Sequence, residues 1–182
     1  MTTTQWDFDR THSSVNFSVR HLMISKVRGV FHDWTGTLVL DDQDVTKSTV
    51  EVTIQAASID TKEEKRDAHL RSADFFEVDK FPTLTFKSTS VEKVSDEEIK
   101  VHGDLTIHGV TKPVVLTTEL GGVQKDPWGG TRTGFSGKVT IEREEFGLRW
   151  NAALEAGGVV VGKKVEIHLE IEAIQKAVAK AA

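Results

Sequence analysis

Apolar and polar residues alternate along most of this chain. Between Ile99 and Ile107, apolar residues or glycine fill every second position, and Lys, His, Asp and Thr fill the positions between them. A period of two places successive side chains on opposite faces of a β-strand, so it predicts a strand with one buried face. Seven further segments show the same pattern: Ser13–His21, Val27–Leu40, Thr49–Ala57, Thr83–Val94, Val114–Leu120, Thr133–Ile141 and Val165–Ile171.

These eight predicted strands follow a short element at Trp6–Phe8. Most are joined by turns too short for a parallel crossover, which predicts antiparallel pairing. Closing the sheet on itself would remove both unpaired edges. The pattern therefore predicts a mainly β fold, an eight-stranded antiparallel barrel, which is just wide enough to be filled by side chains or to hold one slender ligand.

One long stretch, Ser58 to Phe86, interrupts the alternation. Thr61 and Glu64 have the spacing of a capping box, which predicts a helix starting there. Phe81 precedes Pro82, and the residue before proline favours extended geometry, so a strand is expected to resume there. Leu70, Phe75 and Phe76 provide apolar surface that one short helix cannot bury alone. We interpret the stretch as a helical lid across one end of the barrel, anchored by these three side chains.

Apolar residues at inward-facing positions are the candidate lining of the barrel. They are Phe17, Val19, Phe31, Trp34, Leu38, Ile54, Phe86, Leu105, Ile107, Phe135, Ile141, Ile167 and Leu169. No pair of carboxylates shares this face, so the interior suits a hydrocarbon better than a polar metabolite. Glycines at Gly36, Gly103 and Gly137 either remove volume from the interior or bend the strands, which leaves a hollow and a filled barrel both open. In a hollow barrel, Gly103→Phe is expected to block the lumen without unfolding the protein.

Composition narrows the possible functions. The 182 residues fit one domain over 1–182, with a core at about 6–174 and a flexible tail at 175–182. A net charge of −5 argues against nucleic-acid binding. The absence of cysteine excludes disulfides and thiol catalysis. No apolar run is long enough for a transmembrane helix, and the start has no basic and apolar leader, so a cytoplasmic location is expected.

Histidines are the main candidates for chemistry. His102, Asp104 and His108 share one strand face, but it is the outward face, so no metal is expected. His21 shares its parity with Val19 and is a candidate contact for a ligand head group at the barrel mouth. His69 and Asp67 are two residues apart, so they do not face each other on a helix. With no nucleophile motif or cofactor fingerprint, we expect neither enzymatic activity nor a cofactor.

Several motifs together resemble the YceI-like family over about Trp6 to Ile174. They lie at His12–Leu22, Val27–Gly36, Ser58–Thr61, Arg66–Val78, Phe81–Phe86, Gly103–Val114, Arg143–Leu148 and Val165–Ala173. The resemblance implies a lipocalin-like barrel that holds a long isoprenoid or similar lipid chain in its lumen. It also implies a possible homodimer, and many members of the family are periplasmic. The resemblance favours the hollow barrel.

The leading hypothesis is therefore a lipid-binding protein that carries, stores or sequesters an isoprenoid chain, such as the tail of a quinone or prenyl lipid. The ligand would contact the lining residues given above, together with His21, Leu70, Phe75 and Phe76. Two alternatives stay open: a barrel that binds a fatty acid or fatty amide, and a ligand-free, stress-associated interaction module.

Overall fold

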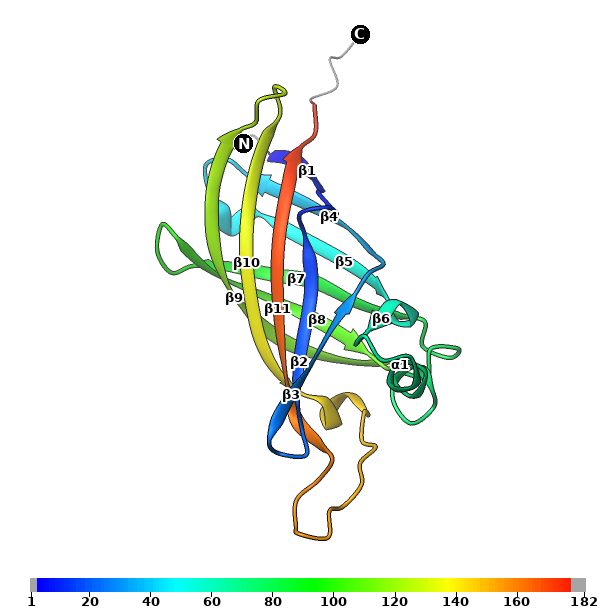
Figure 1. Ribbon diagram of the computed structural model, residues 1–182. Helices are drawn as coiled ribbons and strands as arrows, with labels where there is room; N and C mark the ends of the chain where they lie inside the picture. Colours follow the sequence, from blue (N-terminus) through cyan, green and yellow to red (C-terminus); the bar gives the residue numbers. More distant parts are fainter. Residues whose placement is uncertain (1–2, 178–182) are drawn as a thin grey trace.

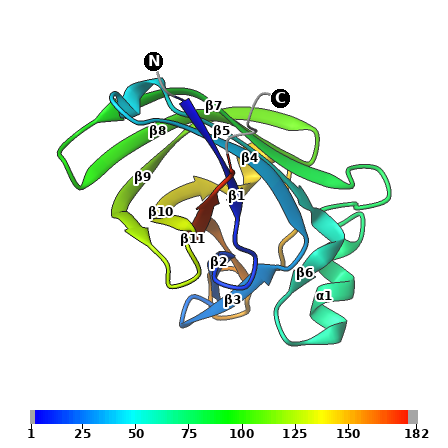
Figure 2. The same cartoon turned by 90° about the horizontal axis from the view of Figure 1, so that it is seen from above.

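Eight antiparallel strands close into a barrel in the computed structural model, which describes residues 3–177 (Figures 1 and 2). The barrel strands, in the order in which they pair, are β1 (Thr3–Phe8), β4 (Trp34–Asp41), β5 (Thr49–Gln55), β7 (Thr83–Lys93), β8 (Glu98–Ile107), β9 (Val110–Lys125), β10 (Thr131–Glu142) and β11 (Val161–Gln175). Pairing of β11 with β1 closes the ring. The predicted fold class is confirmed.

Strand β11 is long enough to pair with two strands along one edge. Its last residues pair with β1, and the segment before them pairs with β2 (Ser14–His21). A hairpin then leads into β3 (Ser25–Phe31), which also pairs with the two-residue strand β6 (Ile59–Asp60). The β2–β3 hairpin therefore extends the barrel wall beyond β1 and β4.

The predicted single strand Val27–Leu40 is wrong, because the chain breaks at His32 and Asp33 into β3 and β4. A second break lies beside it, at the turn that separates β1 from β2. Arg10 in that turn donates hydrogen bonds to the carbonyls of His32 and Trp34. A long-range side chain thus satisfies backbone groups that a continuous strand would bond within the sheet.

One α-helix occurs in the described part of the chain, α1 (Glu64–Arg71), and it lies within the predicted interruption, which also contains the short strand β6. The predicted capping box is wrong. Glu63 caps the helix by accepting from the amides of Lys65 and Arg66, because Lys62, with a φ of 62°, turns the chain between Thr61 and the helix. Three short 3-10 helices complete the elements: η1 (Val45–Lys47), η2 (Ala56–Ser58) and η3 (Arg143–Phe146).

The helical segment packs against the β2–β3 side of the barrel, beside β6 (Figures 1 and 2). The ring of Phe76 meets that of Phe31 with centroids 5.9 Å apart, and Phe31 in turn lies 5.7 Å from Phe17. Leu70 packs against the same buried cluster. Apolar contacts therefore hold the segment against the wall.

No helix within residues 3–177 has the length and apolar character needed to span a membrane. Of the predicted flexible tail, Gln175 belongs to β11, and the Lys176 amide donates to the carbonyl of Gln5. Residues 178–182 lie outside the described residues, so flexibility there stays a prediction.

Candidate functional site

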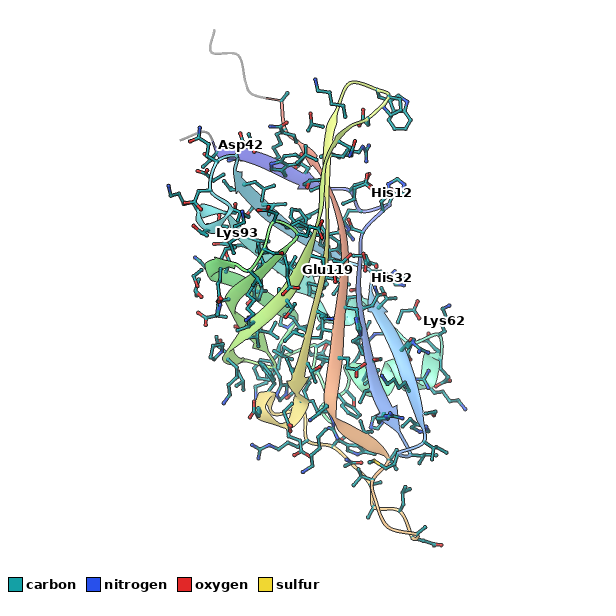
Figure 3. All side chains as sticks on the ribbon, turned by 90° about the vertical axis from the view of Figure 1, so that its left-hand side faces the viewer. His12, His32, Asp42, Lys62, Lys93 and Glu119 are labelled. Carbon is teal, nitrogen blue, oxygen red and sulfur yellow. The ribbon has the colours of Figure 1, made fainter. Side chains whose placement is uncertain are left out.

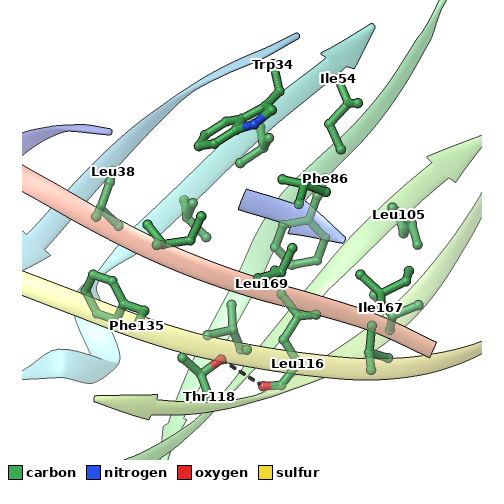
Figure 4. Close-up of a pocket in the computed structure, with 18 of the residues that line it drawn as sticks. Trp34, Leu38, Ile54, Phe86, Leu105, Leu116, Thr118, Phe135, Ile167 and Leu169 are labelled. Carbon is green, nitrogen blue, oxygen red and sulfur yellow. Dashed lines mark hydrogen bonds between the residues drawn. The ribbon is translucent and has the colours of Figure 1, made fainter. Parts of the chain in front are cut away.

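The barrel contains a cavity of about 190 Å³, and each of its eight strands contributes to the lining (Figure 4). About 10–15 Å³ is enough for a single water molecule, so the space far exceeds a packing defect. Alternation explains its origin, because each strand turns every second side chain inward. The barrel is hollow.

None of the described residues that line this cavity carries a charge. Polar side chains come from Asn16, Ser48, Thr49 and Thr118. Asn16 donates to the Ser14 hydroxyl (2.7 Å), the Ser48 hydroxyl accepts from the Asp41 amide (3.1 Å), and the Thr118 hydroxyl donates to the Leu116 carbonyl (3.4 Å; Figure 4). These bonds occupy polar groups that a ligand would otherwise meet, so the lumen presents mainly hydrocarbon.

Most of the predicted lining residues surround the cavity. They are Phe17, Phe31, Trp34, Leu38, Ile54, Phe86, Leu105, Ile107, Phe135, Ile167 and Leu169. Their inward direction follows from strand parity alone, which is why the sequence predicts them. Their contact with a ligand stays a prediction.

Three other predicted residues lie beyond the end of the cavity, toward the β2–β3 hairpin. Val19 and Ile141 both pair with Val165, and Ile141 is buried. His21 pairs with Val161 near the tip of the hairpin. Strand parity predicted the side of the sheet on which these residues lie. It does not predict how far along the barrel the cavity extends, because that depends on the packing of side chains from several strands.

Leu70, Phe75 and Phe76 lie in the helical segment and outside the cavity lining. Leu70 and Phe76 pack against the core behind it. Phe75 is buried between His69 and Trp150, with ring centroids 5.1 and 5.4 Å away. These side chains are therefore placed to anchor the segment against the barrel, and its role as a lid over one end stays a prediction.

Sequence reasoning missed several lining residues. Phe8 belongs to β1, which the sequence showed only as a short element, and Val45 lies in η1, within a region rich in aspartate. Val91 was missed because the pairing of β7 with β8 shifts register between Ser88 and Ser90, which moves odd-numbered residues inward. A bulge of this kind leaves no clear signal in the alternation.

The three glycines have different roles. Gly137 lines the cavity, and a Cβ there would lie 3.5 Å from both the Leu169 and Thr118 side chains, an ordinary contact. A Cβ on Gly36 would lie 2.4 Å from the Glu51 carbonyl oxygen, and one on Gly103 would lie 2.4 Å from the Phe86 ring. The expectation that Gly103→Phe spares the fold is therefore wrong, because strand packing leaves no room at that position.

The histidines do not assemble into one site. His69 contacts Asp74 (2.8 Å) on the helical segment, whereas His21 is in the β2–β3 hairpin. His102 and His108 face different carboxylates, Glu92 and Glu77. Figure 3 shows His12 and His32 on the outside of the barrel.

One carboxylate cluster lies where β11 passes from β2 to β1. Asp9, His12 and Glu172 are close enough to share a metal ion. However, the Arg132 guanidinium already contacts Asp9 (2.7 Å) and Glu172 (2.5 Å). Hydrogen bonds from His12 and Arg132 lower the pKa of Asp9 to about 2. The arginine supplies the positive charge, so the cluster is an ion-pair network that joins strands.

A closed antiparallel barrel around an uncharged cavity defines this protein as a lipocalin-like barrel. The model of the YceI-like domain matches residues 6–173, and the chain belongs to the YceI-like family.

Known proteins agree with this assignment. The chain is 41% identical over 170 residues to protein YceI of Salmonella newport, covering 93% of this chain and 85% of that protein. It is similar to the crystal structure of Campylobacter jejuni YceI protein, with a TM-score of 0.75, 35% identity, and coverage of 87% of this chain and 90% of that one. A polyisoprenoid binding domain from Saccharophagus degradans shares the fold, with a TM-score of 0.68, 15% identity, and coverage of 94% and 98%.

Proposed function

We propose that this protein binds a long isoprenoid chain in its lumen and carries, stores or sequesters it without catalysing a reaction. The observation that carries the proposal is the uncharged, apolar lining of the cavity. Burial of hydrocarbon contributes about 0.8 kcal/mol per CH₂ group. A chain of several isoprene units would therefore bind firmly without a specific polar contact, even after the costs of association and ordering.

The fold neighbour from Saccharophagus degradans supports an isoprenoid as the ligand, since it is described as a polyisoprenoid binding domain. A fatty acid or fatty amide would use the same lumen. The two classes differ in branching, so extraction of the bound molecule separates them. A ligand-free module is disfavoured, because closing the cavity with larger side chains would stabilise a barrel that had no ligand to hold.

Replacing Gly137 tests the proposal, because its Cβ has room while longer side chains must enter the cavity. Gly137→Leu is expected to fold. After purification, its lipid content per chain should be at least tenfold lower than that of the parent, as quantified by mass spectrometry of an organic extract. Gly134→Leu is the matched control. It lies on the same strand, outside the lining, where a Cβ would approach only the Ile171 carbonyl oxygen, at 3.7 Å. Equal lipid content in the parent and both variants would contradict binding in the lumen.

A further inference from the structure

Two apolar segments protrude together at the end of the barrel opposite the start of β1 and the end of β11 (Figure 1). One is the turn of the β2–β3 hairpin, where Met23 is 56% exposed and Ile24 is 78% exposed. The other is the loop 152–158, whose sequence is Ala-Ala-Leu-Glu-Ala-Gly-Gly. The Leu22 amide donates to the Val160 carbonyl (2.9 Å), and the Met23 side chain borders Gly158. We call these two segments, Leu22–Ile24 and 152–158, the apolar tip.

The turn at this tip carries residues that its backbone disfavours. Leu22 and Met23 have φ values of 51° and 62°, and the Ile24 amide donates to the His21 carbonyl (3.2 Å). Two successive positive φ values are disfavoured for residues that carry a Cβ, and glycine, asparagine or aspartate is usually found there. Leucine and methionine gain nothing from this conformation, and Met23 is also exposed. Backbone strain combined with apolar exposure at one turn points to a function for these side chains.

Four basic side chains lie on the outward face next to the apolar tip. Arg20 pairs with Lys26 across the hairpin, and Arg28 follows on the same outward face. Lys164 lies on β11, where it pairs with Glu142 of β10. Of these four, Lys26 forms an ion pair, with Glu166 at 2.8 Å. No carboxylate among residues 3–177 lies within ion-pair distance of Arg20, Arg28 or Lys164. Glu155 lies in the loop itself, yet residues 20–28 and 142–166 together hold seven Lys and Arg against five Glu, a net charge of +2 in a chain whose total is −5.

We propose that the apolar tip docks on the surface of an anionic phospholipid bilayer. Exposed apolar side chains ringed by lysine and arginine are the features by which proteins lie in a membrane interface, because the apolar groups enter the acyl boundary and the cations face the head groups. Strands β2 and β11 join the tip to the lumen, since they contribute Phe17 and Ile167 to its lining. Docking would place the barrel against a source of hydrocarbon chains. The inference extends the proposed function, but its test does not depend on the ligand.

The test is co-sedimentation of the full chain with vesicles of phosphatidylglycerol and phosphatidylcholine, compared with phosphatidylcholine alone. Binding is expected for the anionic vesicles, and it should weaken as salt rises. Met23→Gly/Ile24→Thr should reduce binding at least tenfold. Because glycine suits the positive φ of Met23 and threonine keeps the β-branched shape of isoleucine, the variant should unfold at the same temperature as the parent or higher. Arg20→Gln/Lys164→Gln should reduce binding at least fivefold.

The matched control lies at the opposite end, in the β9–β10 hairpin (Figure 1), where Val123 and Trp128 are 61% and 83% exposed. Val123→Thr/Trp128→Ser should leave vesicle binding unchanged. The proposal is overturned if the parent does not bind anionic vesicles, or if the tip variant binds them as well as the parent does. It is also overturned if the tip variant instead converts a dimer to a monomer in light scattering, because the tip would then contact a second copy of the chain. Retained lipid is measured separately, so failure of docking leaves the lumen proposal intact.

Discussion

Arg143 shows how one buried side chain organises the start of β11. Its guanidinium is almost fully buried and donates to the carbonyls of Leu148, Trp150, Val161 and Gly162 at 2.6 to 3.2 Å. Nothing in the alternation pattern marks this residue, because its partners are backbone groups brought together only by the fold.

Removing this guanidinium would leave several buried carbonyls without a donor. Each unsatisfied group costs about 1–3 kcal/mol. Arg143→Ala is therefore expected to lower the free energy of unfolding by about 3 kcal/mol or more, measured by urea denaturation. Arg149→Ala is the control, since that exposed side chain makes a single 3.4 Å bond to the Glu144 carbonyl. Similar losses for the two variants would contradict the assigned role.

Asp9 predicts a pH dependence of stability. Hydrogen bonds from His12 and then Arg132 lower its pKa from 3.8 to about 2. A carboxyl group with a lowered pKa in the folded state stabilises the fold above its unfolded pKa, and this contribution disappears as the pH falls through the folded pKa. Asp9→Asn should thus be less stable than the parent at pH 7, with a difference that shrinks from pH 4 toward pH 2. A difference that stays constant over this range, in urea denaturation, would rule out the ionised carboxylate as its cause.

At the scale of elements, the helical segment is tied down by a buried carboxylate. One oxygen of Asp67 accepts from the Thr61 amide (2.9 Å) and hydroxyl (2.5 Å), and Asp67 is 4% exposed. Arg66 donates to the same hydroxyl at 2.7 Å. This network, rather than a capping box, fixes the entry to α1.

Asp67→Ala should therefore loosen α1 selectively. The loss of these bonds is expected to cost about 2–3 kcal/mol and to speed hydrogen exchange of the α1 amides, while amides of β8 and β9 keep their protection. Asp74→Ala serves as the control, because the Asp74 side chain is exposed and its ion-pair partner is His69, which lies on the surface segment itself. Unchanged exchange in α1 would show that apolar packing alone holds the segment.

The sequence predicts the strands well because alternation is local, and a strand with one buried face must alternate. It therefore also predicts most of the lumen, including Phe17, Trp34 and Leu169. The errors occur where distant residues decide the local geometry. Arg10 breaks the run from Val27 to Leu40, and a bulge in β7 turns Val91 inward. Neither the Arg10 hydrogen bonds nor the bulge can be predicted from the alternation of apolar and polar residues in the segment that it affects.

At the scale of the whole molecule, the homodimer implied by the family resemblance stays a prediction. Light scattering coupled to size exclusion should give twice the chain mass of 20.2 kDa. A mass that stays at that of one chain across a hundredfold range of concentration would contradict it. Because the apolar tip is proposed to contact a bilayer, Met23→Gly/Ile24→Thr should leave this mass unchanged.

Whole-molecule function depends on whether the hollow barrel holds a lipid. Native mass spectrometry of the intact, purified protein tests this most directly, with tandem analysis of the released molecule. One lipid per chain is expected, with a mass that corresponds to repeated five-carbon units, and it should be lost in Gly137→Leu. A fatty acid derivative in its place would keep the lumen and change the ligand. If the protein shows only the bare chain mass after expression in lipid-rich cells, and gains no mass on incubation with isoprenoids, the lumen does not hold an isoprenoid.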